Sequence, residues 1–340
     1  MSTAIRRPAW AVSVEWPTVG LAIALYAVFG LLTWFHAALP WWALVLIGAY
    51  LVALHGGLQH EVAHGHPTPW PLVNEALVLP SLWLWLPYRS YQRTHLEHHD
   101  DAFLTDPLAD PESFYVTPER WARLGGAARA FLWAHNTVAG RLLLGPFACL
   151  YGLLRNEMLG RSQGHGNPPQ IIPVRDWLLH AIGVALVLGW VLWVCGMPLV
   201  EFLAFIVYPG MALTLLRSFL EHQARGPVGE RTALVEAGPV FALLFLNNNL
   251  HALHHADPSL PWYALPARYR QCRDALLAGN GNYRLSGYGE VIARYLLWPK
   301  EAPVYPLATS ANAPLAEPSL APRGAGPLRE SAAFAPAHHP

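Results

Sequence analysis

Residues 95–99 read HLEHH, and residues 251–255 read HALHH. Both stretches follow the pattern H-x-x-H-H, although they lie far apart in the chain. In a helix, positions i, i+3 and i+4 lie on one face. Each stretch is therefore predicted to present three imidazoles in one direction. The repetition suggests either two copies of one unit or two halves of one site.

A third stretch, HEVAH at residues 60–64, has its histidines at i and i+4, which also share a helix face. A single histidine, His222, follows Glu221 at the end of a long apolar stretch. Neutral imidazole binds zinc, copper, iron and nickel. One metal cannot use so many imidazoles, so we expect two transition metals, each with four or five nitrogen ligands. The nine candidate ligands are His60, His64, His95, His98, His99, His222, His251, His254 and His255.

The composition indicates that lipid surrounds part of the chain. Of 340 residues, 54% are hydrophobic and 13% are charged, whereas an ordinary soluble domain carries about 25% charged residues. Lys+Arg 22 against Asp+Glu 22 leaves a formal net charge of zero, so no nucleic-acid partner is expected. Cys149, Cys195 and Cys272 form no C-x-x-C pair, which argues against a disulfide framework and a thiolate zinc site.

Four stretches reach or approach the length of about 20 apolar residues that a membrane-spanning helix needs. Pro40 separates the first two, and Gly196, Met197 and Pro198 separate the last two, so each pair is predicted to form a tight helical hairpin. The stretches cover about residues 19–36, 41–54, 177–197 and 199–220.

Two further apolar stretches contain polar residues. Residues 72–88 include Glu75 and Pro80, and residues 131–154 include Arg141. Polar groups are costly in open hydrocarbon. Both stretches are therefore predicted to be interfacial or re-entrant rather than spanning.

The basic residues predict an orientation. Arginines precede the first span, occupy the segment between the second and third spans and follow the fourth, whereas the two hairpin tips carry none. The positive-inside rule then places both termini, the long middle segment and almost every clustered histidine in the cytoplasm. The two H-x-x-H-H stretches are thereby predicted to be neighbours on one membrane-anchored face.

These observations predict an all-α integral membrane protein, with four transmembrane helices in two hairpins and a cytoplasmic helical cap that carries the histidines. Residues 1–18 form a cytoplasmic N-terminal segment, and residues 19–300 form the membrane domain. Residues 301–340 are rich in Ala and Pro and lack apolar periodicity. That composition predicts a disordered tail.

The three motifs resemble the histidine boxes of the membrane fatty acid desaturase superfamily. HEVAH, HLEHH and HALHH correspond in order to H-x(3–4)-H, H-x(2–3)-H-H and a late H/Q-x(2–3)-H-H, and the resemblance covers roughly residues 19–299. Stearoyl-CoA desaturases add a histidine after the fourth span, where His222 stands here. They also have an asparagine one helical turn earlier that holds a metal through water. Ser218 takes that position here, and Asn248 or Asn249 is a candidate replacement.

The resemblance implies a non-haem di-iron centre that uses O₂ as co-substrate and oxidises an unactivated C–H bond of a lipid. It also implies a location in the bacterial inner membrane. The chain has no haem-binding, iron–sulfur or dinucleotide motif, so a ferredoxin, rubredoxin or cytochrome-type partner is expected to supply electrons. Ligating imidazoles usually donate their other N–H to a carboxylate or carbonyl. The candidate carboxylates are Glu61, Glu97, Asp100, Asp106 and Glu221.

The reaction itself stays open between two alternatives. The HEVAH and TDPLADPES contexts resemble bacterial proteins grouped with fatty acid desaturases, which favours insertion of a double bond into an acyl chain. Residues 254–266 resemble the H-H-x-x-P-x-x-P-W-x-x-L-P segment of carotenoid ketolases. The second alternative is therefore a hydroxylase or ketolase of a lipid, an alkane or a carotenoid.

Non-enzymatic roles fit the pattern less well. Haem in an electron carrier needs only paired axial histidines, and this chain has many more. A metal transporter would place its ligands near the middle of the bilayer. The histidine motifs here are predicted to lie beyond the ends of the spans.

Overall fold

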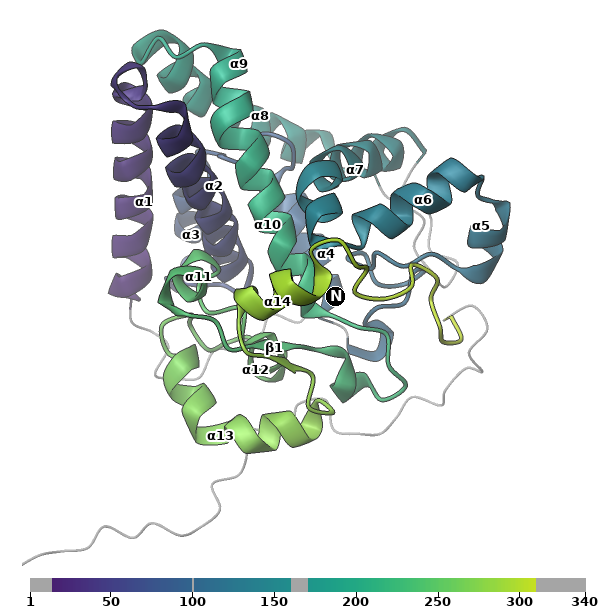
Figure 1. Ribbon diagram of the computed structural model, residues 1–340. Coiled ribbons are helices and arrows are strands. Elements are labelled where there is room, and N and C mark those ends of the chain that lie inside the picture. The colour runs from purple at the N-terminus through teal and green to yellow at the C-terminus, as the bar shows by residue number, and fades with distance from the viewer. Residues whose placement is uncertain (1–13, 100, 160–170, 310–340) are drawn as a thin grey trace, which may run out of the picture.

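The structure is a computed structural model that describes residues 14–99, 101–159 and 171–309. Within these ranges the chain is mostly helical (Figure 1). The helices are α1 (Trp16–Trp34), α2 (Trp41–Ala63), α3 (Pro71–Leu77), α4 (Tyr88–His98), α5 (Pro118–Arg123), α6 (Gly126–His135), α7 (Val138–Leu159), α8 (Val174–Leu188), α9 (Leu199–Phe202), α10 (Tyr208–Glu221), α11 (Pro239–Leu244), α12 (His251–Ala256), α13 (Leu265–Gly279) and α14 (Tyr288–Tyr295).

Short elements complete the described chain. The strands β1 (Leu234–Val235) and β2 (Arg284–Leu285) form a parallel pair in which Leu234 lies opposite Arg284. Three 3-10 turns cover His36–Ala38, Asp101–Phe103 and Val228–Arg231, and two π-helical segments cover Gly189–Val194 and Leu203–Val207.

The first predicted hairpin consists of α1 and α2, joined through the turn His36–Ala38 and Pro40. The prediction ended the second span at residue 54, but α2 continues to Ala63. The polar residues that follow residue 54, among them His55 and Gln59, are fully buried by protein rather than by lipid. Their polarity therefore does not interrupt the helix.

The second hairpin consists of α8 with its π-helical continuation and of α9, the second π-helical segment and α10. Gly196 makes the turn between them with φ +68°, a left-handed conformation that glycine adopts without steric cost. In Figure 1, α1, α2 and α10 run side by side as the long upright part of the molecule.

One stretch that was predicted to be interfacial or re-entrant also has the length and composition of a span. Residues 131–154 were expected to be interfacial or re-entrant, but they divide between α6 and α7, and Val138–Met158 is long and apolar enough to cross a membrane. The described residues therefore contain five such helices, not four. The guanidinium of Arg141 is buried over the rings of Phe114 and Phe219. The charge is thus covered by protein and does not prevent a continuous helix.

The start of the predicted tail is corrected. The backbone N–H of Tyr305 donates to the carbonyl of Val116, and the ring of Tyr305 is buried against Tyr115. The amide of Asn136 donates to the carbonyl of Glu301. Residues 301–309 therefore pack on the domain, held by the contact of two tyrosine rings, one backbone hydrogen bond and one hydrogen bond from a side-chain amide. Residues 310–340 lie outside the described part.

Close backbone contact brings α2 against the second hairpin. A Cβ placed on Gly210 would lie 2.3 Å from the Cβ of Val52, and one on Gly48 would lie 2.7 Å from Ile206. Small residues let helices approach this closely where lipid gives no hydrophobic drive for association. The contact makes α2 the central helix, and α2 carries the first histidine motif.

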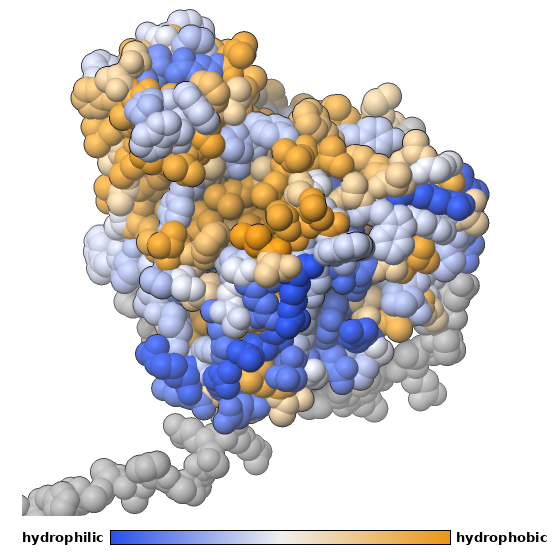
Figure 2. Space-filling model, in the orientation of Figure 1, coloured by the Kyte–Doolittle hydropathy of each residue, from blue (hydrophilic) through white to orange (hydrophobic). Residues whose placement is uncertain are grey.

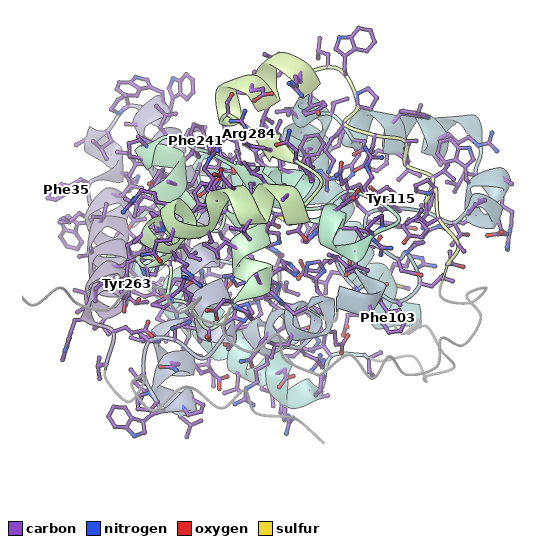
Figure 3. The ribbon with its side chains drawn as sticks, turned by 90° about the horizontal axis from the view of Figure 1, so that it is seen from below. Phe35, Phe103, Tyr115, Phe241, Tyr263 and Arg284 are labelled. Carbon is purple, nitrogen blue, oxygen red and sulfur yellow. The ribbon has the colours of Figure 1, made fainter. Side chains whose placement is uncertain are left out.

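The surface divides into two regions. Figure 2 shows a mostly hydrophobic surface over α1, α2 and α10 and a mostly hydrophilic surface below them, around α13. Side chains such as Ile23, Leu46 and Val200 are exposed on the hydrophobic part. Seen from below in Figure 3, Phe35 of the first hairpin lies on one side, and Tyr115 and Phe103 lie on the other.

The close contact between α2 and α10 at Gly210 predicts the effect of a larger residue there. Alanine favours a helix over glycine by about 1 kcal/mol, but overpacking a filled site costs about 1–3 kcal/mol. We expect Gly210→Ala to lower the thermal midpoint in detergent, because the new methyl group would overlap Val52. Gly20→Ala on α1 is the control, since a Cβ there meets no atom within 4 Å. Equal midpoints for the two variants would contradict the close contact.

Candidate metal centre

The first histidine motif lies at the end of α2. His60 is buried within the helix, and His64 follows its last residue. Their ring centroids are 4.9 Å apart, as expected for positions i and i+4. His55 and His66 lie outside the cluster: the ring of His55 packs against Tyr26, and His66 contacts the carboxylate of Glu15.

The second motif lies at the end of α4, with His99 directly after the helix. His95 and His98 are buried. Tyr91, one turn earlier on the same face, stacks on His95 with 5.4 Å between ring centroids. This stacking and the packing of Tyr91 against Trp83 hold α4 on the core.

His222 follows the last residue of α10, and the third motif forms α12. The strand β1 positions α12 through its backbone. The N–H of Val235 donates to the carbonyl of Asn249, and the N–H of Ala252 donates to that of Ala233. The N–H of Ala233 in turn donates to the carbonyl of Glu221. One short segment therefore joins the end of α10 to the start of α12.

All nine predicted histidines come together in two groups. In each group, one atom per residue lies within 4.8 Å of the corresponding atoms of the others. The two H-x-x-H-H stretches are thus parts of one centre and do not form separate sites. The five-histidine group contains His60, His64, His95, His99 and His254, and the four-histidine group contains His98, His222, His251 and His255.

Ring nitrogens face one another across each group. In the five-histidine group, the Nε2 atom of His95 lies 3.1 Å from that of His64 and 3.2 Å from that of His99. In the four-histidine group, the Nε2 atom of His222 lies 2.9 Å from that of His98 and 3.0 Å from that of His251. Such convergence of nitrogen atoms, with no thiolate among them, suits a transition metal.

Carboxylates contact the outward ring nitrogens. The Nδ1 atom of His95 lies 3.0 Å from Oε1 of Glu112, and that of His98 lies 2.9 Å from Oδ1 of Asp110. Each contact lets the ring donate its outer N–H and keeps the inner nitrogen directed toward the group. Asp110 also accepts from the backbone N–H groups of Thr105 and Glu112, so its position is well defined.

The four-histidine group has a second outer contact at His251. Its Nδ1 atom lies 3.0 Å from Oδ1 of Asn248 and 3.3 Å from Oε1 of Glu221. Glu221 pairs with the partly buried Arg217 at 2.7 Å. Arg217 stands on α10 one turn before Glu221, and it balances the charge of that buried carboxylate.

Burial keeps most rings neutral. It lowers the pKa of His64, His99, His222, His251 and His254 well below the usual value for imidazole. A neutral ring has a lone pair that a metal can bind. The site therefore offers metal-binding nitrogens over a wide pH range.

His98 differs from the other rings. Burial favours its neutral form, but Glu112 and Asp110 outweigh burial and raise the pKa of His98 to about 9. Burial likewise opposes ionisation of Glu112, yet His98 and His95 hold the pKa of that carboxyl below its usual range. The carboxylates that favour a proton on the Nε2 atom of His98 favour a metal cation there for the same electrostatic reason.

The carboxylates predicted to contact the ligating imidazoles differ in whether they do so. Glu221 contacts His251, as described above, whereas Glu61 accepts from the backbone N–H of Trp262 and lies 3.9 Å from the Nδ1 atom of His60. Asp106 accepts from the backbone N–H groups of Leu108 and Ala109. Glu97 is half-buried on α4, and Asp100 lies outside the described residues.

Sequence reasoning missed Asp110, Glu112 and Arg217. The acidic run DPLADPE directly after the second motif signals the first two, because it returns the chain past α4. A charged residue inside an apolar span is a signal for Arg217, since such residues usually face the protein interior and have partners. The candidate replacement Asn248 does reach the centre, whereas Asn249 donates to the carbonyl of Val235 and Ser218 to that of Leu215.

These features define a class of protein. Helices apolar enough to cross a membrane carry two groups of imidazoles, each of which could hold a metal ion. The chain belongs to the fatty acid desaturase family, because the model of the family described as fatty acid desaturase matches residues 36–287. The match includes all nine histidines and confirms the resemblance inferred from the motifs. A search of the curated proteins finds no match to the chain. Membership of the family implies oxidoreductase activity on a lipid.

The outer carboxylates lead to a prediction about metal retention. We expect Asp110→Asn and Glu112→Gln each to weaken metal binding about 10–100-fold, the usual effect of losing a partner of a ligating imidazole. Chelator competition with metal analysis of the purified protein measures this. Glu75→Gln is the control, because Glu75 pairs with Arg89 and not with the histidines. Metal retention that is the same in all three variants would contradict the assignment.

Proposed function

We propose that the protein is a membrane-bound, O₂-dependent desaturase that introduces a double bond into the acyl chain of a lipid. The observation that carries this proposal is the pair of imidazole groups, of five and four histidines, in a chain of the fatty acid desaturase family. In the balanced reaction O₂ accepts four electrons, two from the C–H bonds of the acyl chain and two from a carrier. Four protons complete two waters, two of them from the substrate.

The donor set fits two non-haem irons. Imidazole nitrogens suit iron, burial keeps most of the rings neutral, and carboxylates orient two of them. When bound, the irons supply the oxidation of an unactivated C–H bond by O₂. The nine histidines would ligate the metals, and the carboxylates of Glu112 and Asp110 would orient the rings of His95 and His98. We assign one iron to each of the two groups.

For the membrane topology we propose four spans in two hairpins, with α7 re-entrant, because it packs along α10 as far as Tyr208 and ends near the start of α8. Val138, at the start of α7, packs in one hydrophobic cluster with Leu220, near the end of α10. Near its other end, Glu157 accepts from the indole of Trp177 at the start of α8. Asp176 at the start of α8 pairs with Arg93 on α4. Both ends of α7 therefore approach the histidine end of the molecule.

Cysteine labelling tests this topology in a background in which the native cysteines are serine. Ala128→Cys before α7 and Arg155→Cys near its end are expected to react with an impermeant maleimide from the same side. Ala38→Cys at the tip of the first hairpin is expected to react from the opposite side. These positions are exposed. Labelling of positions 128 and 155 from opposite sides would show that α7 crosses the membrane.

We further propose that the histidines face the cytoplasm of a bacterial inner-membrane protein, as the arginine distribution indicates. Ferredoxin, rubredoxin or a cytochrome-type carrier is the proposed electron donor, because the chain contains no redox cofactor motif of its own. The hydrophilic surface around α13 in Figure 2 lies on the same side as α12 and is open to such a carrier.

The ketolase-like segment has a structural explanation. The backbone N–H of Trp262 donates to Glu61 on α2, and its indole N–H donates to Thr18 on α1. Its carbonyl accepts from the amide of Asn247. Trp262 therefore joins the loop before α12 to the helix of the first motif. Because this role serves any reaction of the centre, the segment does not favour ketolation over desaturation.

An apolar groove of about 770 Å³ lies between α1 and α8. Tyr26, Trp34, Leu82 and Trp190 are among its lining residues, and no member of the two histidine groups lines it. The groove is on the lipid-facing part of the molecule and is separate from the centre. It adds nothing to the assignment of the reaction.

Lipid and carotenoid profiling of cells that express the chain with a compatible electron donor tests the proposed reaction. We expect a new double bond in an acyl chain and its loss in His254→Ala, because that imidazole belongs to the five-histidine group. Membrane insertion of the variant, checked by fractionation, is expected to be unchanged. A new hydroxyl or keto group would instead identify the alternative, a hydroxylase or ketolase of a lipid, alkane or carotenoid.

A further inference from the structure

His222 differs from its neighbours in how its ring is held. The outer nitrogens of His98 and His251 contact polar side chains. The Nδ1 atom of His222 lies near the carbonyl of Arg231 but makes no hydrogen bond within the described ranges. Its Nε2 atom nevertheless faces those of His98 and His251, as a ligand of the four-histidine group must. The orientation of this ring therefore depends on the backbone that carries it.

The backbone at His222 has a carbonyl whose donor must come from another part of the chain. His222 leaves α10 in an extended conformation, with φ −132° and ψ 153°, and it pairs with Thr232 in an isolated antiparallel bridge. The two hydrogen bonds of this bridge are made by the residues on either side, Glu221 and Gln223. In such a pairing the carbonyl of the central residue points away from the opposite chain.

Lys300 supplies the donor for this carbonyl. Its Nζ atom donates to the carbonyl of His222 and lies 3.5 Å from the hydroxyl of Tyr283. That hydroxyl in turn donates to the carbonyl of Leu220, in the last turn of α10. The Lys300 side chain is only 5% exposed, and Glu301 pairs with it at 3.1 Å. A charged donor makes a strong hydrogen bond, and Glu301 balances a charge that would otherwise repel a metal cation.

The segment that carries Lys300 is itself fixed on the domain. The N–H of Lys300 donates to the carbonyl of Asn136, and the amide of Asn136 donates to the carbonyl of Glu301. The side chain lies over the rings of Phe114 and Phe219, whose centroids are 5.2 and 5.7 Å from Nζ. Lys300 lies beyond residues 36–287, which match the family model. The C-terminal segment thus reaches the centre from outside the matched region.

We propose that Lys300 is a positioning residue for His222, which holds the carbonyl at the end of α10 and so fixes the direction in which that imidazole enters the four-histidine group. This inference rests on the proposed metal centre. The ammonium group acts on His222 through its backbone, as Asp110 acts on His98 through its outer nitrogen. A ring that is fixed in advance loses less conformational freedom when a metal binds. Loss of Lys300 is therefore expected to weaken one metal site and to spare the other.

The test compares variants of the full-length protein loaded with ⁵⁷Fe(II) in detergent. Lys300→Met keeps an apolar stem but removes the donor. It is expected to lower the affinity for the iron of the four-histidine group about tenfold, the lower end of the usual effect of losing an outer partner of a ligand. The iron of the five-histidine group is expected to be retained.

Arg141→Met is the matched control. Arg141 is a second buried cation over the same two rings, those of Phe114 and Phe219. Within the described ranges no hydrogen bond joins it to His222. Its loss removes a similar buried charge without releasing the carbonyl, so both irons are expected to be retained.

Chelator competition measures the two affinities, and Mössbauer spectroscopy tells the two irons apart. Asp110→Asn and Glu112→Gln serve as references for the four-histidine and five-histidine groups. An equal loss of both irons in Lys300→Met, no loss in that variant, or the same selective loss in Arg141→Met would each overturn the proposal while leaving the metal centre intact. If the unmodified protein binds no iron, both the proposal and the metal centre fail.

A milder variant covers the case in which Lys300→Met does not fold. Lys300→Gln has an uncharged side chain that is shorter than that of lysine, so its hold on the carbonyl of His222 is weakened. The same selective loss of the iron in the four-histidine group is expected. Retention of both irons in Lys300→Gln would then contradict the proposal.

Discussion

Nine imidazoles packed nitrogen to nitrogen are the constraint on which the rest of the structure depends. Ring nitrogens only about 3 Å apart in the protein interior need protons or metals between them, because buried polar atoms without partners are costly. The rings lie in or directly after α2, α4, α10 and α12. These four elements must therefore end at one place, and the helix contact at Gly210, the β1 segment and the Trp262 contacts each serve that arrangement.

Much of this arrangement could be predicted from local sequence rules. Spacings of three and four residues place histidines on one helix face, and apolar stretches between Pro and Gly breaks define the two hairpins. The nine histidines form two groups that together contain no other residue type, and the family match supports the same identification. A helix through His60 was predicted from the i and i+4 spacing, but the predicted span ended near residue 54 whereas α2 is a candidate span to Ala63. Hydropathy cannot tell whether a polar residue meets lipid or another part of the protein.

The partners of the rings were harder to predict because they depend on tertiary folding. Asp110 and Glu112 reach the centre only when the chain after α4 turns back along it. Asn248 reaches it because the two preceding residues, Leu246 and Asn247, adopt positive φ angles. Sequence propensities do not predict such a backbone for these residue types. Composition describes α7 as a fifth candidate span, and the proposal that it does not cross the membrane rests on contacts of its two ends with distant residues. None of these contacts is visible in a local stretch of sequence.

The two imidazole groups have unequal surroundings. One group has five imidazoles and the other four, and Asp110, Asn248 and Glu221 contact the smaller group. The most direct test is Mössbauer spectroscopy, with metal analysis, of the purified protein loaded with ⁵⁷Fe(II). The account predicts two irons per chain in two distinct nitrogen-rich environments, and no Soret band in the visible spectrum. A protein that binds zinc alone and consumes no oxygen with an electron donor would contradict it.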